Sequence, residues 1–69
     1  MGRGLENRSR SEISGIIDEW IFNERDRHIL KRRLLDGITY ENLSDEFDLS
    51  VRQVKRIVSK SEGVLYRHV

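Results

Sequence analysis

Apolar residues recur at steps of three and four positions in four segments of the chain, a spacing typical of helices that bury one face. No segment alternates apolar and polar residues over the length that a half-buried strand needs. The pattern predicts helices over residues 10–22, 24–36 and 40–47, and a fourth from residue 51 toward the C-terminus. Their expected buried positions are Ile13, Ile16, Ile17, Trp20, Ile21, Ile29, Leu30, Leu34, Leu35, Leu43, Phe47, Val54, Ile57, Val58, Ser61 and Leu65, with Val64 and Val69 as further candidates.

Capping residues precede all four segments and support these boundaries. Each can accept a hydrogen bond from a free amide in the first helical turn. Two of them have a glutamate or glutamine three residues later, which completes a capping box. The capping residues are Ser9 with Glu12, Asn23, Thr39, and Ser50 with Gln53.

Two glycines mark further expected features of the helices. Gly37 follows the second segment, at a place where helices often end in a left-handed residue. Gly63 lies inside the fourth segment, and glycine weakens a helix interior by up to about 1 kcal/mol relative to alanine. We therefore expect the fourth helix to bend or fray beyond Lys60. Residues 1–8 lack apolar periodicity and are expected to form a disordered lead-in.

Residues 39–58 fit a helix-turn-helix, in which two helices pack at a steep angle across a short turn. Ser44 is small where the two backbones approach, and Asp48 accepts a left-handed conformation, although glycine would do so at less cost. The other positions are filled by Leu43 and Phe47 in the first helix, Leu49 in the turn, Ser50 as the second cap, and Val54 and Ile57 in the second helix. We expect an all-α, four-helix domain over residues 9–69 that contains this helix-turn-helix.

Composition narrows the classes of function. The chain has 69 residues and no cysteine, and its two histidines, His28 and His68, have no ligand partners at metal-site spacing. No apolar run approaches the ~20 residues that span a bilayer, and the N-terminus lacks the apolar stretch of a signal peptide. No catalytic constellation or glycine-rich phosphate loop occurs. We therefore expect a cytoplasmic protein without enzymatic activity, metal, cofactor or membrane contact.

Charge is distributed unevenly, although the net charge is only +1. Residues 51–60 contain four basic side chains and no acidic one, whereas residues 41–48 contain four acidic ones. At 100° per residue, Arg52, Arg56 and Ser59 lie opposite the apolar face of the fourth helix, with Lys55 and Lys60 beside them. This segregation favours a polyanionic partner. We expect the helix to enter the major groove of duplex DNA, where Arg52, Gln53, Lys55 and Arg56 reach base edges and phosphates.

Three groups of residues leave alternatives open. The basic residues of the second helix could clamp phosphates, or form ordinary surface charge in which Arg25 or Arg33 pairs with a nearby carboxylate. Thr39 and Tyr40 could meet a phosphate at the start of the third helix, or Tyr40 could pack at the boundary of the core. Apolar residues at the two ends of the domain could pack on one another, which we favour, or form a dimer seam. They are Trp20, Phe22, Val64, Leu65 and Tyr66.

The run from Asn23 to Val58 resembles region four of bacterial sigma factors, their C-terminal promoter-reading domain. The matching elements are ERDR at 24–27, LDGITYE at 35–41, LS at 49–50 and VKRI at 54–57. The run is also similar to small sigma-like regulators encoded by phages and prophages of Gram-positive bacteria. It departs from the usual motif in having Ser44 in place of alanine and Asp48 in place of glycine.

The resemblance implies a four-helix domain whose last helix reads promoter DNA. The residues that it would bring into the groove are Ser50, Arg52, Gln53, Lys55 and Arg56, and those that would contact phosphates are Thr39, Tyr40 and Arg33. It also implies contact with RNA polymerase. A chain this short leaves no room for the helices with which sigma factors bind the polymerase core and melt the promoter. A stand-alone regulator is therefore favoured.

Two hypotheses follow. The first is a sequence-specific DNA-binding transcriptional regulator in the bacterial cytoplasm, nucleoid-associated or phage-encoded, with RNA polymerase and a second copy of the chain as further candidate partners. It gives DNA-contacting roles to Arg33, Thr39, Tyr40, Ser50, Arg52, Gln53, Lys55, Arg56 and Lys60. The second is a protein-interaction module that binds RNA polymerase or another regulator without touching DNA. The basic face of the fourth helix discriminates between them, because only the first hypothesis needs it.

Overall fold

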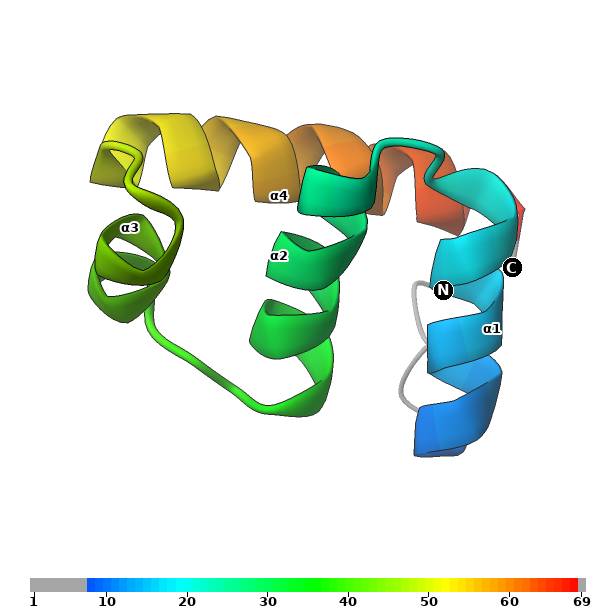
Figure 1. Ribbon diagram of the computed structural model, residues 1–69. Coiled ribbons are helices and arrows are strands. Elements are labelled where there is room, and N and C mark those ends of the chain that lie inside the picture. The colour runs from blue at the N-terminus through cyan, green and yellow to red at the C-terminus, as the bar shows by residue number, and fades with distance from the viewer. Residues whose placement is uncertain (1–7, 69) are drawn as a thin grey trace.

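The structure of the chain is a computed structural model that describes residues 8–68 (Figure 1). It contains four helices, α1 (Arg10–Trp20), α2 (Glu24–Leu35), α3 (Tyr40–Phe47) and α4 (Val51–Tyr66). No strand occurs in the described part, and the predicted all-α, four-helix fold is confirmed. The lead-in expected over residues 1–8 lies, apart from Arg8, outside the described residues, as does Val69. No described helix is both long enough and apolar enough to cross a membrane.

The predicted N-caps all begin their helices. The Ser50 hydroxyl accepts a hydrogen bond from the Gln53 amide, and the Gln53 side chain accepts one from the Ser50 amide at 3.0 Å. The same reciprocal pair joins Ser9 and Glu12 at the start of α1, and these hydrogen bonds lower the pKa of Glu12. The side chains of Asn23 and Thr39 accept from amides of the first turns of α2 and α3. Local capping chemistry therefore sets where each helix starts.

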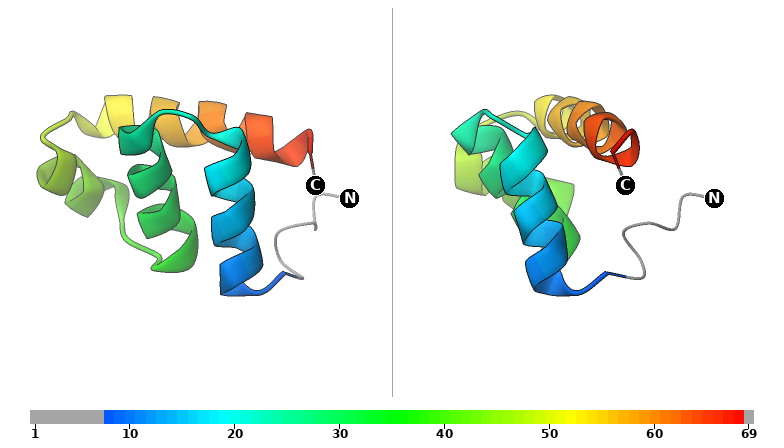
Figure 2. Two further views of the ribbon diagram at one scale, coloured as in Figure 1. Left: turned by 45° about the vertical axis from the view of Figure 1, so that its right-hand side comes forward. Right: turned by 90° about the vertical axis from the view of Figure 1, so that its right-hand side faces the viewer.

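The helices form one layer of three with α4 lying across one end of it, as Figures 1 and 2 show. α2 is central and contacts each of the other three helices, and α4 does the same. The side chains buried between them are Ile17, Ile21, Ile29, Leu30, Leu43, Val54, Val58 and Leu65. All of these were predicted to be buried. Because α4 buries one side along the layer, its other side is left facing outward.

The turn between α3 and α4 has the backbone that a helix-turn-helix requires. Asp48 takes a left-handed conformation with φ of 56°, as predicted, and the Leu49 amide donates to the Ser44 carbonyl at 3.0 Å. Gly37 also takes the expected left-handed conformation, with φ of 67°, after α2. These two residues allow the chain to turn at either end of α3. Both ends of α3 are therefore fixed relative to α2 and α4.

Three of the five apolar residues at the two ends of the domain pack within the molecule, Phe22 and Tyr66 are exposed, and the dimer seam stays a prediction. The Trp20 ring stacks on the His68 ring with centroids 3.6 Å apart, Leu65 is fully buried, and Val64 packs against the core. Phe22 instead lies in the link between α1 and α2 with 78% of its surface exposed. Packing within the molecule therefore holds for Trp20, Val64 and Leu65, whereas Phe22 is left outside the core.

The fraying predicted beyond Lys60 does not occur, because α4 continues through Gly63 to Tyr66. The burial of Ser61 and Leu65 on the inner side of α4 offsets the weak helix propensity of glycine.

Replacing Gly63 with alanine is expected to raise the free energy of unfolding by about 0.5–1 kcal/mol. A Cβ built at Gly63 meets nothing within 4 Å, so the gain in helix propensity is not offset by a clash. Urea unfolding followed by circular dichroism measures the change. The same substitution at Gly37 is a matched control: its surroundings are equally open, but its positive φ should make alanine destabilising there. Stabilisation by both substitutions would contradict the argument.

Candidate nucleic-acid interface

The outer side of α4 is a basic surface. Arg52, Lys55, Arg56 and Lys60 are all exposed, while Val54 and Val58 on the other side of the helix are buried. None of the four cations pairs with a carboxylate within residues 8–68. The outward basic side predicted for the last helix is therefore present, and its cations are unpaired within residues 8–68.

Ser50 and Gln53 lie exposed at the start of this basic surface. The side-chain oxygen of Gln53 accepts the hydrogen bond of the capping box, which leaves its NH₂ group able to donate. The capping box thus holds Gln53 in one orientation beside Arg52 and Arg56. A fixed donor in this place suits recognition of an acceptor on a base edge.

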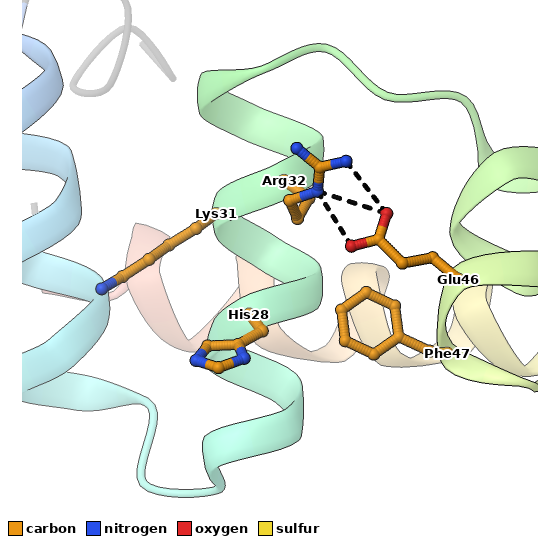
Figure 3. A pocket seen from close by; sticks show the side chains of 5 residues that line it. All are labelled: His28, Lys31, Arg32, Glu46 and Phe47. Carbon is orange, nitrogen blue, oxygen red and sulfur yellow. Dashed lines mark hydrogen bonds and ion pairs between the residues drawn. The ribbon is translucent and has the colours of Figure 1, made fainter.

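The basic residues of α2 are held mostly by contacts inside the molecule. Lys31 pairs with Asp18 of α1 at 2.8 Å, and the Arg32 guanidinium pairs with Glu46 of α3 at 3.0 Å. Figure 3 shows these two side chains pointing to opposite neighbours of α2. Arg27 donates to the carbonyls of Ile21 and Asp18 at the end of α1.

These contacts perturb the ionisation of the groups involved. The hydrogen bond from Lys31 lowers the pKa of Asp18, and hydrogen bonds from Arg10 and Arg32 lower the pKa of Asp36. The hydrogen bond to Glu46 raises the pKa of Arg32. Arg25 pairs with Asp26 at 3.3 Å, as one of the alternatives anticipated. For these cations the surface-charge interpretation is favoured over phosphate clamping.

Arg33 differs from its neighbours in α2. It pairs with no carboxylate among residues 8–68, so of the two arginines named in that alternative only Arg25 forms the ion pair. Its guanidinium donates to the Ile38 carbonyl at 3.1 Å and lies over the Tyr40 ring, with Cζ 4.3 Å from the ring centroid. The Lys55 ammonium lies 5.7 Å from the same centroid. Tyr40 is half-buried and packs against the core, so its boundary role is real.

The residues proposed to contact DNA fall into two groups. Ser50, Arg52, Gln53, Arg56 and Lys60 belong to the outer side of α4 or its cap. The side chains of Lys55, also on α4, and of Arg33 on α2 both reach the ring of Tyr40 at the start of α3. Thr39 precedes Tyr40 and is exposed, with its hydroxyl oxygen accepting from the Asn42 amide at 3.2 Å. Sequence reasoning named all of these residues but missed the meeting of two cations on Tyr40, since no periodicity links three helices.

Other chemistries find little support in the described part of the chain. No three His, Cys, Asp or Glu side chains within residues 8–68 are grouped so that they could hold a metal ion. The exposed acidic residues Glu41 and Asp45 belong to α3, so they lie on a different helix from the basic side of α4. The arrangement is that of a charged docking surface.

Comparison with known protein families identifies one match. The model of the family "Sigma-70, region 4" matches residues 22–62, which is more than half of the chain and includes α2, α3 and most of α4. Comparisons with curated proteins and with solved structures gave no significant match. The family is one of DNA-binding helix-turn-helix domains, and the structure has the turn and the outward basic helix that such a domain needs. The chain therefore belongs to the sigma-70 region 4 family.

Proposed function

We propose that the chain is a sequence-specific regulator of transcription that reads duplex DNA by placing α4 in the major groove. Arg52, Gln53 and Arg56 face base edges, because they occupy the outer side of the first turns of α4, which a recognition helix directs into the groove. Ser50 lies at the groove end of the helix. Phosphates on either side are contacted by Arg33, Thr39, Tyr40, Lys55 and Lys60.

The observation that supports this proposal most directly is that the cations of α4 are unpaired whereas most of those of α2 are not. Most of the basic side chains of α2 pair with carboxylates or cap α1, whereas those of α4 have no acidic partner within residues 8–68. A helix that was basic only for solubility would be expected to share in such pairing. Cations that are exposed, unpaired and gathered on one helix suit a polyanion.

The salt dependence of binding provides a first test. If about four phosphates are neutralised, log affinity for a labelled duplex is expected to fall by about 3 to 4 per log unit of salt, because each contact releases condensed counterions. Fluorescence anisotropy titrations of the chain against a mixed-sequence duplex, at several salt concentrations, measure this slope. An affinity that hardly changes with salt would contradict phosphate neutralisation and therefore the proposal.

A second candidate function is capture of a protein partner, RNA polymerase or another regulator. An open groove of about 380 Å³ between α2 and α3 favours it. Phe47 and His28 line this groove, together with Lys31 and the ion pair of Arg32 and Glu46 (Figure 3). The groove is built from residues other than the exposed cations of α4. Removal of those cations would therefore abolish DNA binding but leave such a partner bound.

We also propose that the regulator works in the bacterial cytoplasm as a dimer or beside a partner on DNA. One short recognition helix offers few base contacts, and specific sites usually need more. Selection of bound sequences from a random duplex pool distinguishes the cases. An inverted repeat would indicate a dimer, and a single half-site would indicate a monomer.

A further inference from the structure

Two cations from different helices meet on one aromatic ring. Arg33 belongs to the last turn of α2, Tyr40 is the first residue of α3, and Lys55 lies in the second turn of α4. The Arg33 Cζ atom is 4.3 Å and the Lys55 Nζ atom 5.7 Å from the centre of the Tyr40 ring. Both distances are within the range at which an aromatic face attracts a cation.

This cluster of two cations has no anion of its own. Neither Arg33 nor Lys55 pairs with a carboxylate among residues 8–68, although several cations of α1 and α2 do. Two positive charges held at the same ring repel each other, and a bound anion would reduce that cost. Because the hydrogen bond to Ile38 uses one N–H of Arg33, the remaining N–H groups of its guanidinium are free to donate.

The Tyr40 hydroxyl completes the group of donors. It has no hydrogen-bond partner among the described residues. Every buried side-chain polar atom in that part of the chain does have a partner, so the hydroxyl is not buried. The hydroxyl must therefore reach solvent, although the ring is half-buried. Donors of three types, a guanidinium, an ammonium and a hydroxyl, are therefore gathered at one ring.

We infer that Arg33, Tyr40 and Lys55 form one binding site for a single backbone phosphate of DNA, in which Tyr40 is a positioning residue. Its ring holds the guanidinium and the ammonium in place before the phosphate arrives. The site lies on the side of α4 nearest α3, next to the base-reading residues, where the backbone bordering the groove passes. The inference rests on the proposed function, and it adds that these three side chains bind one phosphate jointly.

The expected benefit of Tyr40 is preorganisation. A free lysine or arginine side chain loses rotamer freedom when it binds a phosphate, and a side chain already held on a ring loses less. From the usual strength of exposed cation–π contacts, removing the ring is expected to weaken duplex binding about fivefold. Most of the effect should vanish when the cations themselves are absent, because the ring acts through them and only the hydroxyl acts directly.

The test measures binding of the full chain to a labelled mixed-sequence duplex by fluorescence anisotropy. Tyr40→Leu keeps an apolar side chain against the core but removes the ring, and about fivefold weaker binding is expected. Tyr40→Phe restores the ring and should recover most of the loss. In the Arg33→Gln/Lys55→Gln background, Tyr40→Leu should have a much smaller effect, limited to the loss of its hydroxyl as a donor. Thermal unfolding of each variant shows whether the domain remains folded.

A second measurement leaves Tyr40, which packs against the core, unchanged. If Arg33 and Lys55 share one phosphate, Arg33→Gln/Lys55→Gln should reduce the slope of log affinity against log salt by about 0.9, whereas two separate phosphates would give about 1.8. The larger reduction, or no reduction, would overturn the single site. Equal losses from Tyr40→Leu with and without the cations, or failure of Tyr40→Phe to rescue, would overturn the positioning role.

Failure of this inference is distinguishable from failure of the proposed function. Arg52 and Arg56 lie outside the Tyr40 cluster, and their replacement tests groove reading alone. If that replacement abolishes binding while the Tyr40, Arg33 and Lys55 variants bind like the unmodified chain, only the phosphate site is wrong. If the unmodified chain binds duplex DNA without salt dependence, the proposed function and this inference both fall.

Discussion

Replacement of both Arg52 and Arg56 by alanine is expected to weaken binding to the preferred duplex by about 100-fold or more. A well-placed contact between an arginine and a base edge contributes about 1–3 kcal/mol, and each 1.4 kcal/mol is tenfold in affinity. Both side chains are exposed and have no acidic partner within residues 8–68, so their loss breaks no internal ion pair. The free energy of unfolding should change by less than about 0.5 kcal/mol.

A control with the same change in net charge separates the basic surface of α4 from charge in general. Arg10→Ala/Lys31→Ala also removes two cations, but these pair with Asp36 and Asp18 away from α4. Its effect on DNA binding should be small, because salt screens charges at that distance. Anisotropy titrations on a selected sequence measure both double variants. Equal losses of affinity would show that the two arginines have no special place in recognition.

The helix boundaries could be predicted because the interactions that set them are local. An N-cap and its partner are three residues apart, as in Ser50 with Gln53, and both are visible in the sequence. The left-handed conformation of Asp48 could be predicted in the same way, because few residues separate the apolar positions of α3 from those of α4 and the turn between them must be tight. The observed ends of α1 and α2, Trp20 and Leu35, therefore lie within two residues of those predicted.

The partners of the charged residues could not be predicted, because they depend on how helices pack. Lys31 meets Asp18 of α1 and Arg32 meets Glu46 of α3, and periodicity within one helix does not encode either pair. The sequence thus left phosphate clamping and surface charge equally open for α2. The structure resolves this by tying most of these cations to neighbouring helices and leaving Arg33 on Tyr40.

Phe22 and Gly63 show the limits of pattern reading at single positions. Phe22 follows an apolar stripe but lies beyond the last turn of α1, where no neighbouring helix covers it. Gly63 has a poor intrinsic propensity for helix, yet the residues around it are buried against α1 and α2, and the helix continues. In both places tertiary packing decides the outcome, and a rule based on neighbouring residues in the sequence does not take that packing into account.

The largest expected effect on stability is that of Leu30→Ala. Leu30 is fully buried in α2, the helix that contacts all three others. Truncation of a buried leucine removes transfer free energy and leaves a cavity, at a cost of about 2–5 kcal/mol. A domain of this size has about 3–5 kcal/mol in total to resist unfolding. The variant is therefore expected to be largely unfolded at 25 °C, as measured by circular dichroism and urea titration.

Phe22→Ala is the matched control, because it also truncates a large apolar side chain but does so where 78% of the surface is exposed. Its free energy of unfolding should change by less than about 0.5 kcal/mol. Leu30→Ala should also lose DNA binding, although Leu30 touches no DNA, since the buried side of α4 rests on α2 and holds Arg52 and Arg56 outward. A folded Leu30→Ala chain of nearly unchanged stability would mean that α2 does not form the centre of the core, and the account of how α4 is presented would then be wrong.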